Sequence, residues 1–169
     1  MNERIHLPPQ HDMIPETVPL VFLGGPAEGA PDWQTPTAIS LTDNIDTVHV
    51  ASPRRRTVNG FNYDQHIRWE KDHLRRSSEL GVIMFWFAAQ RPDILGSAAQ
   101  SYAQRNRIEI GRVLGWHDYN PFPLVIGIDP HYTMSGGGNE HYFRSLAAEA
   151  NIPVYDDLEE TIDQTILRI

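Results

Sequence analysis

One carboxylate of this sequence is set among apolar neighbours, as catalytic acids and nucleophiles often are. Glu109 lies between Ile108 and Ile110 in the segment 106–111 (Asn-Arg-Ile-Glu-Ile-Gly), and no lysine follows it three or four residues on. A glutamate there is poorly solvated, which makes it a candidate for chemistry. Beside an anomeric carbon it could attack that carbon or stabilise an oxocarbenium-like transition state. The alternative is an ordinary surface glutamate of a helix.

A glycine turn follows the first apolar run of the chain. Residues 18–23 carry no charge, and Gly24, Gly25 and Pro26 come next. Because glycine has no side chain, a ligand can approach bare backbone at such a turn. We therefore predict that Gly24, Gly25 and Pro26 belong to a binding site.

The segment 62–70 (Asn-Tyr-Asp-Gln-His-Ile-Arg-Trp-Glu) combines carboxylates with aromatic side chains. Asp64 falls in the first turn of a predicted helix. The helix dipole stabilises a carboxylate there, so Asp64 can have a purely structural role. Asp64 or Glu70 could instead protonate a leaving group. Trp69, or Trp86 in a later segment, could stack on a base or simply pack in the core.

Two further segments could hold an anion. The run Arg54–Arg56 could clamp a phosphate, since guanidinium matches phosphate oxygens in pairs, or it is a solvated loop. Gly136–Gly138 precede a predicted helix, whose N-terminus could receive an anion, or they form a flexible loop.

Composition excludes several classes of protein. The 169 residues include no cysteine, so disulfides, thiolate catalysis and cysteine-bound zinc are ruled out. The net charge of −8 argues against a nucleic-acid polymer as partner. No apolar run reaches the roughly 18 residues of a membrane span, and the eight histidines have no metal-ligand spacing. We expect a cytoplasmic protein without cofactor, metal or membrane contact.

Short uncharged runs alternate with helical patterns along the chain. Residues 1–17 are expected to form a loose, flexible arm, because three prolines interrupt pairing there, and 18–169 a single domain. Strands are predicted at 18–23, 47–51, 81–88, 124–128 and 153–155. Helices are predicted within 32–46, over 62–78 behind an Asn62 cap, over 97–115 with a break near Asn106 that would bring Glu109 close to a helix start, over 139–150, and from Asp156 onward.

This alternation predicts an α/β protein with a five-stranded parallel sheet between two layers of helices. In such sheets ligands bind beyond the carboxyl ends of the strands. The residues expected at those ends are Gly24-Gly25, Ser52-Pro53, Trp86 and Asp129-Pro130. The sequence therefore predicts a site at that edge.

Over residues 18–168 the chain resembles the nucleoside 2-deoxyribosyltransferase-like family. The resemblance rests on five segments in order, namely 22–26 (Phe-Leu-Gly-Gly-Pro), 63–70 (Tyr-Asp-Gln-His-Ile-Arg-Trp-Glu), 82–86 (Val-Ile-Met-Phe-Trp), 107–111 (Arg-Ile-Glu-Ile-Gly) and 152–160. It implies a flavodoxin-like three-layer sandwich and cleavage of an N-glycosidic bond.

In the family's terms, Glu109 would be the nucleophile, and the sugar would pass to a second base or to water. Asp64 would face sugar or base, and the turn at Gly24 and Gly25 would lie under the ribose. Tyr63, Gln65, Trp69, Glu70, Trp86, Pro26 and Arg54 complete the expected substrate-binding set. The family also implies a homo-oligomer. Large aromatic residues in and just after the helix of Glu109 favour the same conclusion, namely Tyr102, Trp116, Tyr119 and Phe122.

Two other functions stay open. A related hydrolase would cleave nucleoside 5′-monophosphates and would need Arg54–Arg56 or Gly136–Gly138 for the phosphate. A nucleotide-binding module with a decayed site would account for Leu80-Gly81, which stand where the family commonly has Ala-Asp before its third strand.

Overall fold

A computed structural model describes residues 2–11, 13–54, 62–93, 102–132 and 139–169. Its strands are β1 (Ile5–His6), β2 (Leu20–Gly24), β3 (His49–Ala51), β4 (Gly81–Phe87), β5 (Leu124–Ile128) and β6 (Val154–Tyr155). Its helices are α1 (Gln34–Asn44), α2 (Tyr63–Glu79), α4 (Gln104–Tyr119), α5 (Asn139–Glu149) and α6 (Leu158–Ile166).

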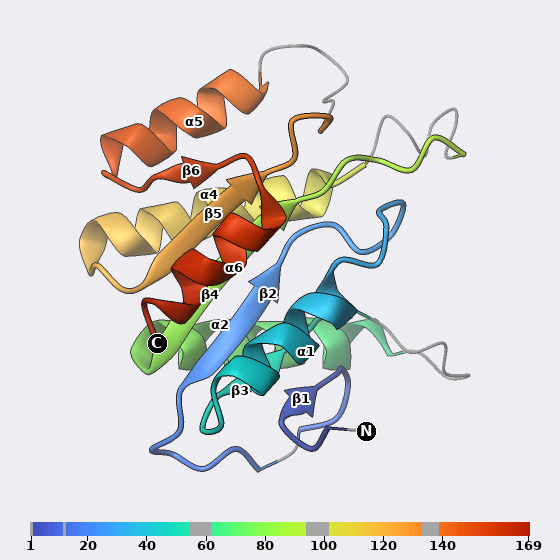
Figure 1. Ribbon diagram of the computed structural model, residues 1–169, viewed down its shortest axis with the longest axis vertical. Coiled ribbons are helices and arrows are strands. Elements are labelled where there is room, and N and C mark those ends of the chain that lie inside the picture. Colours follow the sequence, from blue (N-terminus) through green and yellow to red (C-terminus); the bar gives the residue numbers. More distant parts are fainter. Residues whose placement is uncertain (1, 12, 55–61, 94–101, 133–138) are drawn as a thin grey trace.

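The strands form one six-stranded sheet in the order β1-β3-β2-β4-β5-β6, and every pair is parallel (Figure 1). Without β1, this is the order of flavodoxin-like folds, in which the chain switches direction between its first and third strands. The predicted fold class is therefore confirmed, with six strands where five were expected. The switch lies between β2 and β4.

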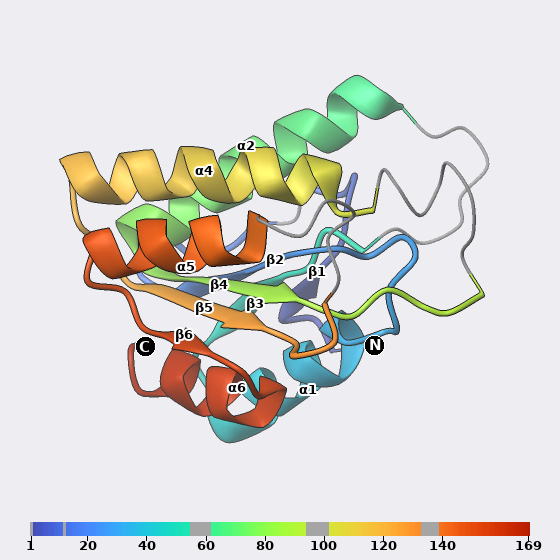
Figure 2. The same ribbon diagram turned by 90° about the horizontal axis from the view of Figure 1, so that it is seen from above.

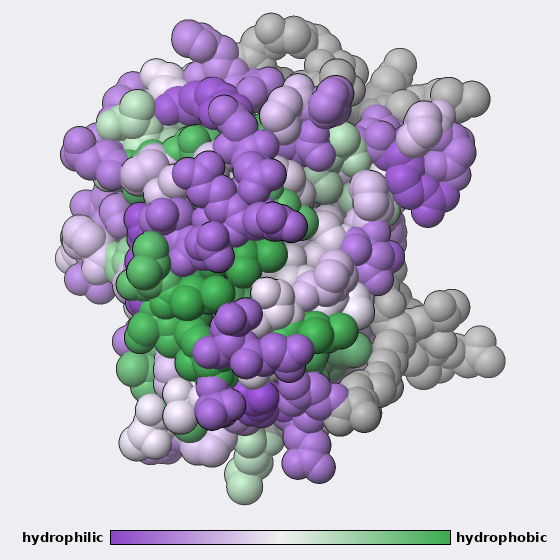
Figure 3. All heavy atoms as spheres, in the orientation of Figure 1, coloured by the Kyte–Doolittle hydropathy of each residue, from purple (hydrophilic) through white to green (hydrophobic). Residues whose placement is uncertain are grey.

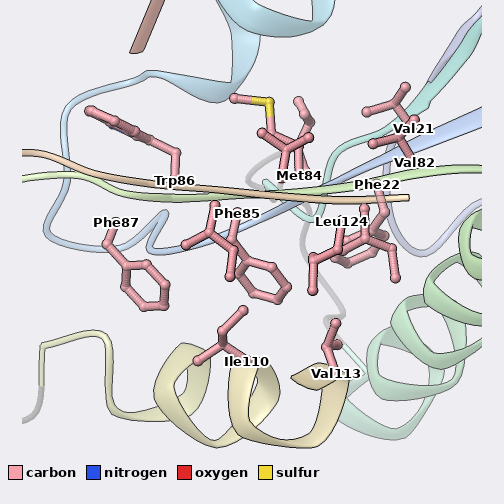
Figure 4. Close-up of a cluster of buried hydrophobic side chains, with 14 of the residues drawn as sticks. Val21, Phe22, Val82, Met84, Phe85, Trp86, Phe87, Ile110, Val113 and Leu124 are labelled. Atoms are coloured by element: carbon pink, nitrogen blue, oxygen red, sulfur yellow. The ribbon is translucent and has the colours of Figure 1, made fainter. Parts of the chain in front are cut away.

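Helices cover both faces of the sheet, as Figure 2 shows: α2, α4 and α5 lie on one side and α1 and α6 on the other. β2, β4 and β5 are buried along almost their whole length because both faces are covered. Alternate side chains of β4 point to opposite layers, so Phe85 and Phe87 face Ile110 of α4 while Met84 and Trp86 face away from it (Figure 4).

The segment predicted as a loose arm contains the additional strand. Ile5 and His6 pair with Val50 and Ala51 at the edge of the sheet, and His6 is 1% exposed. The prediction of a loose arm is therefore wrong for these residues. The three prolines that suggested it all come after the strand, at Pro8, Pro9 and Pro15.

Helix boundaries differ from the prediction at two places. α4 begins at Gln104 and runs past Gly115 to Tyr119, and residues 97–101 of the predicted helix lie outside the described residues. The last helix is capped by Asp157, whose side chain accepts a hydrogen bond from the backbone N–H of Glu160. The Asp156 carboxylate pairs instead with Arg144 of α5. The Asn62 cap of α2 is confirmed.

The face of the molecule that Figure 3 shows is mostly hydrophilic, with local exceptions. Hydrophobic side chains interrupt the face that carries α1 and α6 (Figure 3). On the α4 side, Ile108 and Tyr119 are exposed. Tyr102 is buried in the hydrophobic core, and Phe122 is partly buried and packs against that core. The aromatics expected to mark an interface therefore do not form one exposed patch. None of the described helices is both long and apolar enough to cross a bilayer.

Candidate active site

A cavity of about 620 Å³ opens at the carboxyl edge of the sheet, beside the switch between β2 and β4. The loops after β2 and β3 form one part of its wall, and the first turns of α2 and α4 form the other. Its described lining residues are Gly25–Gly29, Pro53, Arg54, Tyr63, His66, Glu70 and Tyr102–Asn106. This is the edge at which the sequence predicts a site.

Gly25 begins the loop that lines the cavity behind β2. Its φ is +136°, and a Cβ at this position would lie 2.1 Å from the backbone oxygen of Trp86. Only glycine fits there. Gly24 lies opposite Phe85 in the sheet, and a Cβ on it would lie 2.5 Å from that ring. Gly24 thus serves strand packing, whereas Gly25 and Pro26 line the cavity.

Arg54 lines the cavity from the end of β3. Its Nε lies 3.3 Å from an Asp32 carboxylate oxygen, and its Nη1 donates to Gln34 Oε1 at 3.3 Å. The guanidinium is therefore held by α1 and the loop before it, with its charge balanced by Asp32. Arg55 and Arg56, the rest of the basic run, lie outside the described residues, as do Gly136–Gly138.

α2 contributes a hydrogen-bonded pair to the cavity. His66 Nε2 lies 3.0 Å from Glu70 Oε1, one turn along the helix, and the side chains are only 3% and 12% exposed. The other oxygen of Glu70 pairs with Arg105 of α4. Glu70 thus lies between a histidine and an arginine, and each contacts one of its two oxygens. The ion pair of Glu70 with Arg105 connects two helices that are distant in sequence.

Glu109 lines a second, adjoining cavity of about 520 Å³ between α2 and α4. The two cavities share four lining residues, namely Tyr63, Glu70, Gln104 and Arg105. Beyond these, apolar side chains of both helices line the second cavity, including Ile67 and Ile108. The predicted nucleophile therefore stands next to the main cavity and does not line it.

The Glu109 carboxyl is electrostatically unusual. Burial raises its pKa to about 7, while Arg105, a hydrogen bond with the Asn106 side chain and Arg112 act in the opposite direction. Desolvation penalises the charged carboxylate, and the two arginines and the amide recover only part of that penalty. At neutral pH the group is divided between its acid and its base, as groups that transfer protons or attack carbon often are.

Other predicted site residues lie elsewhere. Asp64 and Gln65 are exposed on α2 and line neither cavity. Trp69 is fully buried, stacks on His73 at 4.1 Å and donates to the backbone oxygen of Gln10, so it packs in the core. Trp86 points to the face of the sheet opposite the one that faces Ile110 of α4 (Figure 4). The structure thus assigns the two tryptophans to packing.

Several residues at the site were not among the predicted ones. His66 could have been found from its spacing of four to Glu70, which places both on one helix face. Arg105 precedes Glu109 by four residues, and Arg112 follows it by three. Because only lysines after Glu109 were considered as its partners, neither arginine was predicted. Nothing in the sequence pairs Arg105 with Glu70, because that contact joins separate helices.

Comparison with known proteins adds nothing to this geometry: no protein-family model and no curated protein matches the chain. The class that the structure defines is a flavodoxin-like α/β protein with a polar cavity at its topological switch. Within the described residues, no group of three or more histidine, aspartate or glutamate side chains is arranged to hold a metal ion.

Proposed function

We propose that this protein cleaves the N-glycosidic bond of nucleosides, with Glu109 as the nucleophile. The single observation that carries the proposal is a desolvated carboxyl, with a pKa near 7, next to a polar cavity at the switch of a flavodoxin-like sheet. The resemblance to the nucleoside 2-deoxyribosyltransferase-like family, which selects the same glutamate, supports it independently.

In the proposed reaction, a Glu109 oxygen attacks C1′ of the sugar as the bond from C1′ to the base nitrogen breaks. The bonding electrons leave with the base, which takes up a proton. Of the two carboxylates considered for that proton, Glu70 lines both cavities and Asp64 lines neither. We therefore assign the proton to the hydrogen-bonded pair of His66 and Glu70. A second base, or water, then releases the sugar from Glu109.

The charges of the main cavity favour an unphosphorylated substrate. Among its described lining residues, the cations Arg54 and Arg105 are each paired with a carboxylate, that of Asp32 or that of Glu70. A phosphate would have to compete with these pairs. A nucleoside needs only hydrogen-bond partners and close approach to the backbone, and the lining segment from Gly25 to Gly29 begins and ends with a glycine.

Incubation with deoxynucleosides, ribonucleosides and their 5′-monophosphates, with and without an acceptor base, tests the proposal. Free base without acceptor indicates a hydrolase, and base exchange indicates a transferase. Release only from monophosphates would favour the related hydrolase. Binding without turnover would favour the nucleotide-binding module, an alternative that the placement of Glu109 outside the main cavity keeps open.

Glu109→Gln should reduce base release by several orders of magnitude, as loss of a nucleophile does. The matched control is Glu149→Gln, because Glu149 is an exposed glutamate at the end of α5. Mass spectrometry of the quenched wild-type reaction should find a sugar attached to the peptide that carries Glu109. If Glu109→Gln retained more than a tenth of the wild-type rate, Glu109 would not be the nucleophile.

A further inference from the structure

Arg105 and Glu70 each line both cavities and form an ion pair with one another across the shared wall. Arg105 is the second residue of α4, one helical turn before Glu109. Its guanidinium pairs with the Glu70 carboxylate of α2, and its side chain is 42% exposed. A flexible cation at a helix start is thus fixed by a partner on another helix.

The partner of Arg105 is itself held in place. The Glu70 side chain is 12% exposed. One of its oxygens is hydrogen-bonded to the ring of His66, which is 3% exposed. A carboxylate with little solvent and a fixed neighbour has few alternative positions. The guanidinium that pairs with it is therefore positioned at the cavity between α2 and α4 that Glu109 also lines.

Other charged groups near Glu109 come from both helices. α4 presents Arg112, whose guanidinium carbon lies 4.2 Å from the centre of the Trp116 ring, one turn further along the helix. From α2, Glu70, Lys71 and Tyr63 line the same cavity. Without Arg105, the carboxylates of Glu70 and Glu109 would line the same cavity without the ion pair that joins α2 to α4 there.

We propose that Arg105, fixed by Glu70 and His66, is a positioning residue that favours the ionised form of Glu109 at the border of the two cavities. This role rests on the proposed function of Glu109, but the electrostatic coupling can be measured without any reaction. Arg105 is also the strongest of the groups that oppose the effect of burial on the pKa of Glu109. Removing it takes away a favourable charge and leaves Glu70 as an unfavourable one.

A carbon-13 NMR titration of the glutamate carboxyls measures the coupling directly, with Glu109→Gln identifying the Glu109 signal. Arg105→Gln should raise the pKa of Glu109 by about 0.5 to 1, as expected for the loss of an opposite charge one helical turn away in a partly solvated site. Arg112→Gln is the matched control, with the same substitution on the same helix, and should give a smaller rise. Arg105→Lys should restore most of the wild-type value.

The pH profile of base release then tests the consequence for catalysis. If Glu109 is the nucleophile, the acid limb of kcat should move upward with the NMR value in Arg105→Gln and return in Arg105→Lys. An unchanged Glu109 titration in Arg105→Gln, or an equal rise in Arg112→Gln, would overturn the coupling. A shifted titration in a protein whose wild-type form releases no base would instead refute the proposed function and leave the coupling intact.

Discussion

Replacing His73 with glutamine should make the fold less sensitive to acid. His73 lies in α2, is 6% exposed, stacks on Trp69 and places Nδ1 2.7 Å from the Trp69 backbone oxygen, so this nitrogen carries the proton and donates. Burial lowers its pKa from 6.5 to about 4, and the nearby His6 and His11 act in the same direction. The fold therefore prefers a neutral imidazole.

The sign of the effect follows from linkage. Because the pKa is lower in the folded than in the unfolded chain, the stabilisation is complete above about 6.5 and is lost as the pH falls toward 4. A shift from 6.5 to about 4 corresponds to about 3 kcal/mol in total. Of this, about 2 kcal/mol is lost between pH 7 and pH 5. The His73→Gln variant lacks this loss.

Urea unfolding of wild type and His73→Gln at pH 7, 6 and 5 measures the difference. The variant starts with a cost of its own, since a buried ring is replaced, but its free energy of unfolding relative to wild type should improve by about 2 kcal/mol between pH 7 and pH 5. His141→Gln, at an exposed histidine of α5, is the control and should show no such trend. A difference that stays constant with pH would refute the argument.

Three further predictions concern other parts of the molecule. Glu109→Gln should show the opposite trend: its raised pKa of about 7 stabilises wild type by up to about 2 kcal/mol as the pH falls from 7 to 5, and urea unfolding should find this gain missing in the variant. Gly25→Ala should cost at least about 2 kcal/mol, because its Cβ would meet the Trp86 oxygen, whereas Gly111→Ala, in open space on α4, should stabilise the protein by roughly 0.5 to 1 kcal/mol. We also predict a homo-oligomer, and light scattering at micromolar concentration that gave a mass near 19.2 kDa would contradict it.

The sequence alone determined the central architecture. β4 could be predicted because its uncharged run 81–87 is typical of a strand covered on both faces, and this burial does not depend on which neighbours cover it. The α2 cap at Asn62 was also predictable, because its side chain accepts a hydrogen bond from the N–H of Gln65, only three residues away. Repeated alternation of such elements leaves few folds other than a parallel sheet between helices.

Only the tertiary structure decided which residues meet. β1 is two residues long, and its partners at Val50 and Ala51 lie far along the chain, so no local pattern shows it. The alternation of side chains along β4 is evident in the sequence. The sequence does not show which face of the sheet Trp86 points to. The ion pair of Arg105 with Glu70 joins helices that are separated by a strand. Contacts of this kind depend on how helices pack on the sheet, and the spacing of residues along the chain carries no record of that.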